Sequence, residues 1–278
     1  MMFSNPFVEL SASISPDVMQ AYVIIMFLCV VGGTLFDVVH KGSAKYFFEN
    51  ARRAREKGSK QLGGGDMAGI AVKTVAEDVL TSAEFCNPNR RIAHLLGMYG
   101  FVFFVLATVV MVFSLPGSAS GFWSFLWHLG ALMVCVGGFW FWFFIRVDVA
   151  SEGNPWHRIV RADLFILSLV ATTTSGLLWS FLQSAGATVL SALFLILFIA
   201  ASTVLFGGVI WSKFAHMFFK PAAAFQKRVA VADGSLDNLP RPADRTMSED
   251  SDRHSMELLK DAPLNMGLGI KREAPHHY

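Results

Sequence analysis

Apolar residues are concentrated in five long runs along the chain, at about residues 19–39, 92–113, 123–145, 162–182 and 189–211. Each run matches the roughly 20 mostly apolar residues that a helix needs to cross a bilayer. We expect the helix of the last run to continue to Phe219. The pattern therefore predicts an all-α, integral membrane bundle of five transmembrane helices.

Composition supports this class of protein. The chain has 278 residues, of which 54% are hydrophobic and 26 are phenylalanine, which excludes an ordinary soluble domain. Acidic residues, Glu9 and Asp17, precede the first run, and no cleavage site of small residues follows it, so we expect no removable signal peptide. A nucleic-acid partner is not expected.

The distribution of lysine and arginine predicts the orientation. The two connections rich in these residues, and the segment after the last run, all fall on one side of the membrane, whereas "SLPGSASG" and "QSAGAT" carry no charge. The positive-inside rule assigns the basic side to the cytoplasm. We therefore predict a periplasmic N-terminus at 1–18, a first span at 19–39, a cytoplasmic loop at 40–91, a four-helix bundle at 92–220 and a cytoplasmic tail at 221–278.

The loop "SAKYFFENARRAREKGSK" has the pattern of a basic amphipathic helix. Phe47, Ala51 and Ala54 recur at helical spacing, while Lys45, Arg52 and Arg55 project elsewhere. Such a helix can lie against membrane lipids or dock a partner protein, and the sequence leaves both open. The later stretch "GGGDMAG" lacks the Lys-Ser/Thr of a phosphate loop, so we interpret it as a flexible turn.

The tail after residue 221 is rich in Pro, Asp, Ser and Arg, and its middle lacks the apolar residues needed to fold by itself. We predict a disordered tether. Its end, "LNMGLGIKREAPHHY", regains apolar residues, which predicts that this segment contacts a soluble partner.

Histidines are the candidate ligands. The three cysteines form no CxxC pair, so this chain alone cannot build an iron–sulfur cluster or a zinc ribbon. His94 opens the second span and His216 closes the fifth, so the topology puts both near the cytoplasmic face. Two such histidines can hold a haem iron, form interfacial hydrogen bonds, or contact a quinone. His128 enters from the opposite side, and we expect it to be a packed or interfacial residue.

Several motifs carry a resemblance to known families. "HLLGMYGFVFF", "WHLGALMVCVGG", "TTTSGLL" and "WSKFAHMFFKP" resemble the membrane subunits of respiratory nitrate reductase (gamma type) and of the quinone-interacting membrane oxidoreductase of sulfate metabolism. The loop from "KYFFENARRAREKG" to "CNPNRRIAHLLGMYGF" and the end "MGLGIKREAP" resemble the membrane anchor of dissimilatory adenylylsulfate reductase in sulfur-oxidising bacteria. The resemblance implies the bacterial inner membrane.

The resemblance also implies a role and ligands. The partner would be a cytoplasmic adenylylsulfate reductase with flavin and iron–sulfur subunits, exchanging electrons with quinone through haem b. His94 and His216 match one histidine pair of the two-haem relatives, whereas the deeper pair is replaced by Phe104 and Phe198, so at most one haem is expected.

Basic residues near that pair are candidates to contact haem propionates or a quinone. They are Arg90, Arg91 and Lys213. Ordinary positive-inside anchoring explains them equally well. The alternative function is a haem-free scaffold that only docks the soluble enzyme. A transporter is disfavoured, because no predicted span carries a charge near its middle.

Overall fold

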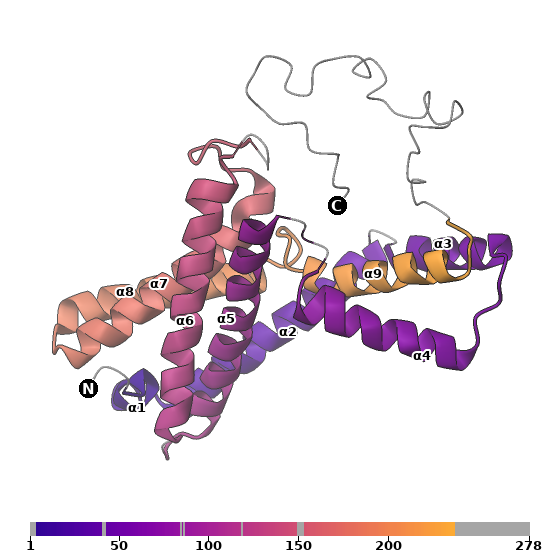
Figure 1. The fold of residues 1–278 in the computed structure, drawn as a ribbon. Coiled ribbons are helices and arrows are strands. Elements are labelled where there is room, and N and C mark those ends of the chain that lie inside the picture. Colours follow the sequence, from indigo (N-terminus) through magenta and orange to yellow (C-terminus); the bar gives the residue numbers. More distant parts are fainter. Residues whose placement is uncertain are drawn as a thin grey trace, which may run out of the picture.

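The computed structural model describes residues 4–40, 43–83, 85, 87–117, 119–148 and 153–236 (Figure 1). Within these residues the chain is helical and forms no strand. Five helices are long and apolar enough to cross a membrane, which confirms the predicted class of a multi-pass helical bundle. They are α2 (Pro16–His40), α5 (Pro88–Phe113), α6 (Gly121–Trp140, extended by the π-helix η2, Phe141–Ile145), α7 (Leu164–Ser184, preceded by the 3₁₀ turn η3, Arg161–Asp163) and α8 (Thr188–Gly207).

Glycines allow α5 and α6 to touch backbone to backbone. A methyl group on Gly100 would lie 2.7 Å from the carbonyl oxygen of Gly130, and one on Gly137 would lie 2.7 Å from that of Ala93. Small residues at helix contacts are typical of membrane bundles, where close van der Waals packing replaces the hydrophobic effect. These glycines therefore fix how α5 and α6 cross.

An aromatic cluster joins the α5–α6 pair to the α7–α8 pair. Trp127 and Trp179 are 0% and 1% exposed, and both contact Phe7 of the short helix α1 (Pro6–Leu10) edge-on. The Nε1 of Trp127 donates a hydrogen bond to the hydroxyl of Thr108 at 3.0 Å. This bond satisfies the one polar atom of a large buried ring.

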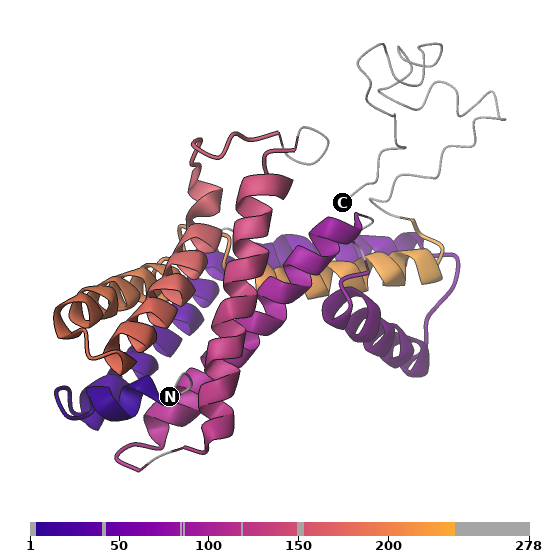
Figure 2. The ribbon, with the colours of Figure 1, turned by 60° about the vertical axis from the view of Figure 1, so that its left-hand side comes forward.

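Three further helical segments lie together beside the bundle, to the right in Figure 1, and Figure 2 shows the same grouping from another side. They are α3 (Ser43–Lys57), α4 (Gly64–Lys73) continued by the π-helix η1 (Thr74–Leu80), and α9 (His216–Ala232). We call this group the appended unit. It adjoins the end of the bundle where α2 and α6 finish and where α5 and α7 begin, which we call the basic end.

The C-terminal ends of α3 and α9 are hydrogen-bonded to each other. The carbonyl oxygen of Asp233 accepts hydrogen bonds from the backbone nitrogens of Ser59 and Lys60, at 2.8 and 3.1 Å. The predicted basic amphipathic helix is thus present as α3, and Ala54 on its apolar side is buried.

Two boundaries differ from the sequence expectations. The fifth span ends at Gly207 instead of continuing to Phe219, and α9 begins as a separate helix at His216. The chain turns at Gly208, where a methyl group would lie 2.4 Å from the carbonyl oxygen of Val204. Since α9 continues past Pro221 to Ala232, the expected tail boundary at 221 falls inside a helix, whose second half is rich in helix-forming alanine. The end of the predicted tether lies outside the described residues.

The glycine-rich stretch at 63–69 is a helix start, not a flexible turn. The backbone nitrogen of Gly63 donates to the carboxylate of Asp66 at 3.0 Å, and α4 begins at Gly64. An acidic side chain three residues into a helix stabilises the unpaired nitrogens at its N-terminus. This interaction offsets the low helix propensity of the glycines.

Candidate functional site at the basic end

His94 lies near the start of α5 and contacts the turn that leads into that helix. Its Nδ1 is 3.0 Å from the hydroxyl oxygen of Ser82, and its ring centroid is 4.9 Å from that of Phe85. Asn87 caps α5 by accepting from the nitrogens of Asn89 and Arg90, so the position of His94 is fixed by a well-capped helix.

Three side chains of α5 hold the preceding turn, and His94 is one of them. Arg91 donates through Nε to the carbonyl oxygen of Thr81 at 2.7 Å, and the Tyr99 hydroxyl donates to that of Leu80 at 2.7 Å. Ser82 has a left-handed backbone (φ 49°) and is 1% exposed. We call Arg91, His94 and Tyr99 the α5 clasp, because together they attach the end of η1 to the bundle.

His216 is the first residue of α9 and packs on a different helix. Its ring centroid is 5.5 Å from that of Phe165 on α7, and its Nδ1 contacts the carbonyl oxygen of Lys213. A carbonyl can only accept a hydrogen bond, so Nδ1 carries the proton and Nε2 keeps the lone pair. Burial lowers the pKa of His216, and although the backbone hydrogen bond opposes this shift, the ammonium groups of Lys220 and Lys213 add to it.

Phe85 connects the surroundings of the two histidines. Its ring contacts His94, and the Nζ of Lys220 lies 5.3 Å from its centroid, a cation–π distance. Lys220 follows His216 by one helical turn. The two histidines therefore border one junction, but no hydrogen bond or ring contact joins their imidazoles within the described chain.

The cationic candidates are separated by their surroundings. Arg91 is used by the clasp, whereas the side chains of Arg90 and Lys213 are exposed. Lys213 meets His216 through its carbonyl oxygen and not through its ammonium group. Of the three cations, Arg90 and Lys213 have the exposure that contact with an external anion requires.

Phe104 and Phe198, at the deeper positions of the predicted pair, do face each other. Their ring centroids are 6.4 Å apart and nearly perpendicular, and both residues are buried in the aromatic cluster. The Phe198 ring also stacks on Trp179 at 5.6 Å. Aromatic rings thus fill the region between α5 and α8 at this depth.

His128 is a packed residue, as expected. Its Nδ1 is 2.7 Å from the carbonyl oxygen of Ser124, and its Nε2 is 2.9 Å from the hydroxyl of Ser180. With both ring nitrogens in hydrogen bonds and 8% of the residue exposed, this histidine joins α6 to α7.

Comparison of the chain with protein-family models, curated proteins and solved structures found no match. The assignment of function depends on the resemblances and on the geometry. Among the described residues, no group of three or more His, Cys, Asp or Glu side chains is placed to bind a metal ion. Two histidines that serve as axial ligands of a haem would not form such a group.

A buried ion pair at the basic end was not predicted from the sequence. Arg146 follows η2, is 1% exposed and donates through its NH2 group to the carboxylate of Asp163, just before α7, at 2.6 Å. Its other contacts are the carbonyl oxygens of Asn154, Pro155 and Arg158. One guanidinium thus organises the connection between α6 and α7. A basic residue ending one run and an acidic residue opening the next was the available signal.

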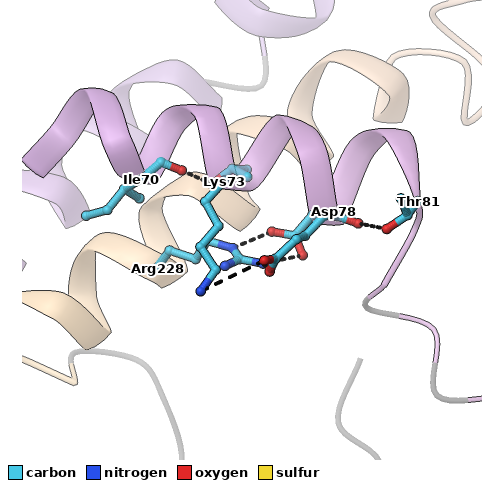
Figure 3. Close-up of polar contacts among 7 residues, drawn as sticks. Ile70, Lys73, Asp78, Thr81 and Arg228 are labelled. Atoms are coloured by element: carbon cyan, nitrogen blue, oxygen red, sulfur yellow. Dashed lines mark hydrogen bonds and ion pairs between the residues drawn. The ribbon is translucent and has the colours of Figure 1, made fainter.

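A second unpredicted network joins α9 to η1 (Figure 3). The guanidinium of Arg228 donates to both carboxylate oxygens of Asp78, at 2.6 and 2.9 Å, and to Glu77 at 2.8 Å. These hydrogen bonds raise the pKa of Arg228 above its ordinary value, so the group is always charged. Bidentate geometry fixes direction as well as distance. The network orients α9 against η1, and the α5 clasp holds η1 to the bundle.

Proposed function

We propose that this chain is the membrane anchor of a cytoplasmic oxidoreductase in the bacterial inner membrane. The observation that carries the proposal is the appended unit, a helical body outside the five spans that is fixed to the basic end by the α5 clasp and by Arg228. The positive-inside rule puts the basic end in the cytoplasm and the N-terminus in the periplasm. The appended unit then lies where a soluble enzyme can dock.

The partner that the resemblance supports is adenylylsulfate reductase, with its flavin and iron–sulfur subunits. In this arrangement the soluble enzyme carries out the chemistry on the sulfur substrate, and the anchor passes electrons between that enzyme and the quinone pool. The end of the tail, at 264–278, is a second candidate contact with the partner and lies outside the described residues.

A b-type haem would be held by His94 and His216, and its iron would carry single electrons. The donor chemistry of His216 fits this role. Its Nδ1 donates to the Lys213 carbonyl, and the hydrogen bond orients the ring and leaves Nε2 as the ligand atom. Burial keeps the imidazole neutral, the form that binds a metal. His94 has a comparable hydrogen bond from Nδ1 to Ser82. Arg90 and Lys213 are the exposed cations available to propionates or to a quinone.

A haem-free scaffold is the second candidate, and the packing of His94 favours it. This imidazole already closes the turn at Ser82 and stacks on Phe85, so it has a structural role that needs no haem. His216 packs on Phe165 at the start of α9 in the same manner. On this reading the two histidines attach the appended unit and transfer no electrons.

Affinity purification of the full chain from native membranes tests the proposal and separates its two forms. We expect flavin and iron–sulfur subunits to accompany the chain, and recovery of the chain without any redox enzyme would contradict the anchor function. The reduced-minus-oxidised absorption spectrum of the same sample tests the haem. Bands of a b-type haem support electron transfer, and their absence leaves the scaffold.

Substitutions then test the ligands. If haem is present, His94→Gln and His216→Gln should each remove the low-spin spectrum, because one imidazole cannot maintain two axial bonds. His128→Gln is the matched control and should leave the spectrum unchanged, since both His128 nitrogens are bonded within the bundle. Loss of the spectrum in the His128 variant alone would move the haem to the other end of the bundle.

A further inference from the structure

Helix α3 presents a basic and aromatic face to the solvent. Lys45, Phe48, Arg52 and Arg55 follow one another at spacings of three, four and three residues, which places them along one side of a helix. All four are exposed, and Phe48 is 69% exposed. We call these residues the Phe48 face.

The opposite side of α3 is used by the protein itself. Ala54 is 5% exposed, and the backbone oxygen of Phe47 accepts a hydrogen bond from Gln226 of α9 at 3.5 Å. The predicted apolar side, Phe47, Ala51 and Ala54, therefore packs within the appended unit and cannot insert into lipid. The Phe48 face is the side of this helix that remains for an external partner.

The face carries excess positive charge. Helix α3 has five basic and two acidic side chains, a net charge of +3. Its ion pairs, Lys45 with Glu49 and Arg52 with Glu56, have long separations of 3.8 and 3.7 Å and are largely exposed. Such pairs hold little energy and are exchanged readily for other anions.

The chain path keeps this face close to the membrane surface. Helix α2 has 25 residues, so it is about 37 Å long and exceeds the roughly 30 Å hydrocarbon core. Only two residues separate its end, His40, from Ser43, a path of at most roughly 11 Å. Phe48 lies five residues further, or about 7.5 Å along a helix. The face therefore starts at headgroup level.

From these observations we infer that the Phe48 face binds anionic lipid headgroups of the membrane that the protein spans. Arg52, Arg55 and Lys45 contact headgroup phosphates, and the Phe48 ring enters the boundary between headgroups and acyl chains. Clusters of basic residues next to a spanning helix bind anionic lipids in this way. The contact fixes the outer side of the appended unit to the bilayer, independently of any soluble partner.

The test uses the full chain in lipid nanodiscs, with the fluorescent label on Phe48→Cys and with Cys29, Cys86 and Cys135 replaced by serine. One set of discs contains phosphatidylcholine alone, and the other contains equal parts of phosphatidylcholine and phosphatidylglycerol. We expect quenchers on the acyl chains to quench the label in the anionic discs only. A label that is exposed to water in both discs, or quenched equally in both, would overturn the inference.

Charge removal identifies the cations involved. Arg52→Gln with Arg55→Gln should lower the ratio of docked to undocked face about 25-fold, since each cation near an anionic surface contributes about fivefold. Arg53→Gln is the matched control, because Arg53 is exposed on the other flank of α3 and should change the ratio less than about twofold. An equal effect of Arg53 would show that only the net charge of the helix matters and would contradict the assigned face.

Two further arms exclude other causes. Inorganic phosphate added to the phosphatidylcholine discs should not protect the label, and protection would indicate a soluble anion as the ligand. Amide exchange of the unsubstituted protein needs no label or variant, and α3 should exchange more slowly in anionic discs, with the protection lost at high salt. Identical exchange in both discs would refute the lipid contact.

Discussion

The bundle and the appended unit each depend on an arginine–carboxylate contact of 2.6 Å, and the two contacts differ in burial. The Arg146 side chain in the bundle is 1% exposed and that of Asp163 is 11% exposed, whereas Arg228 in the appended unit is 24% exposed and faces Glu77, which is 47% exposed. The same bond length therefore occurs in two different dielectric environments.

Burial decides what each contact does. Removing one partner of a buried pair leaves an uncompensated charge, so the Arg146 contact tolerates no change and is insensitive to salt. The half-exposed Arg228 contact stays accessible to water and ions, so its strength depends on conditions. The bundle is a rigid frame, and the attachment of the appended unit can be adjusted without unfolding it.

Arg146→Met should cause the largest effect on stability. It strands the Asp163 carboxylate and several loop carbonyls, and we expect it to destabilise the bundle by about 3–5 kcal/mol. Thermal unfolding of the purified protein in detergent measures the loss. Arg158→Met is the control, since the exposed side chain of Arg158 makes no printed ion pair and only its carbonyl contacts Arg146. Equal loss in both variants would contradict the role of burial.

Gly130→Ala should be the next most harmful change. The added methyl group would lie 2.7 Å from both the Gly100 carbonyl oxygen and the Phe104 nitrogen, so α5 and α6 must separate, at a cost of about 1–3 kcal/mol. Gly97→Ala, on α5, meets no atom within 4 Å and should leave the same unfolding transition in place or raise it. If Gly97→Ala were as harmful, the close contact would not be the cause.

Arg228→Gln should loosen the appended unit and spare the bundle. Loss of the contacts with Asp78 and Glu77 costs about 1 kcal/mol at this exposure. We expect faster amide exchange in η1 and α9, with unchanged exchange in α5 and α6. Lys227→Gln removes the same charge at an exposed neighbouring position and should have no such effect. Raising the salt concentration should mimic Arg228→Gln in the wild-type protein.

Acidification should have the smallest effect, at His216. Its folded pKa lies below the ordinary value of 6.5, so the unfolded state binds the proton first as the pH falls. The stabilisation by neutral His216 is complete above pH 6.5 and is lost as the pH falls through the folded pKa. Amide exchange of residues 208–217 should quicken between pH 7.5 and 5.5 in the wild type and change less in His216→Gln. Faster exchange at the higher pH would reverse the assigned sign.

The sequence predicted the bundle well and the appended unit poorly, for a physical reason. Long apolar runs are a local signal, so the five spans were found, and helical spacing around Ala54 found α3. The break after Gly207 lies inside a run that is apolar on both sides, and hydropathy cannot register it. The partners of Arg228 lie some 150 residues away in the chain, at Glu77 and Asp78, so no local pattern indicates them.

The candidate site was predicted to a similar extent. Topology brought His94 and His216 to the same end of the bundle, and Phe104 opposite Phe198 shows that the paired positions on α5 and α8 were matched correctly. The clasp formed with Ser82 could not be foreseen, because it depends on a left-handed turn that has no glycine to mark it.

The most direct test of the account is the distribution of the oxidoreductase between membrane and soluble fractions in cells of the source organism. The account predicts that adenylylsulfate reductase activity sediments with membranes when the wild-type chain is present and becomes soluble when the chain is deleted. Arg228→Gln should release a larger share of the activity than Lys227→Gln. Equal membrane retention with and without the chain would contradict its function as an anchor.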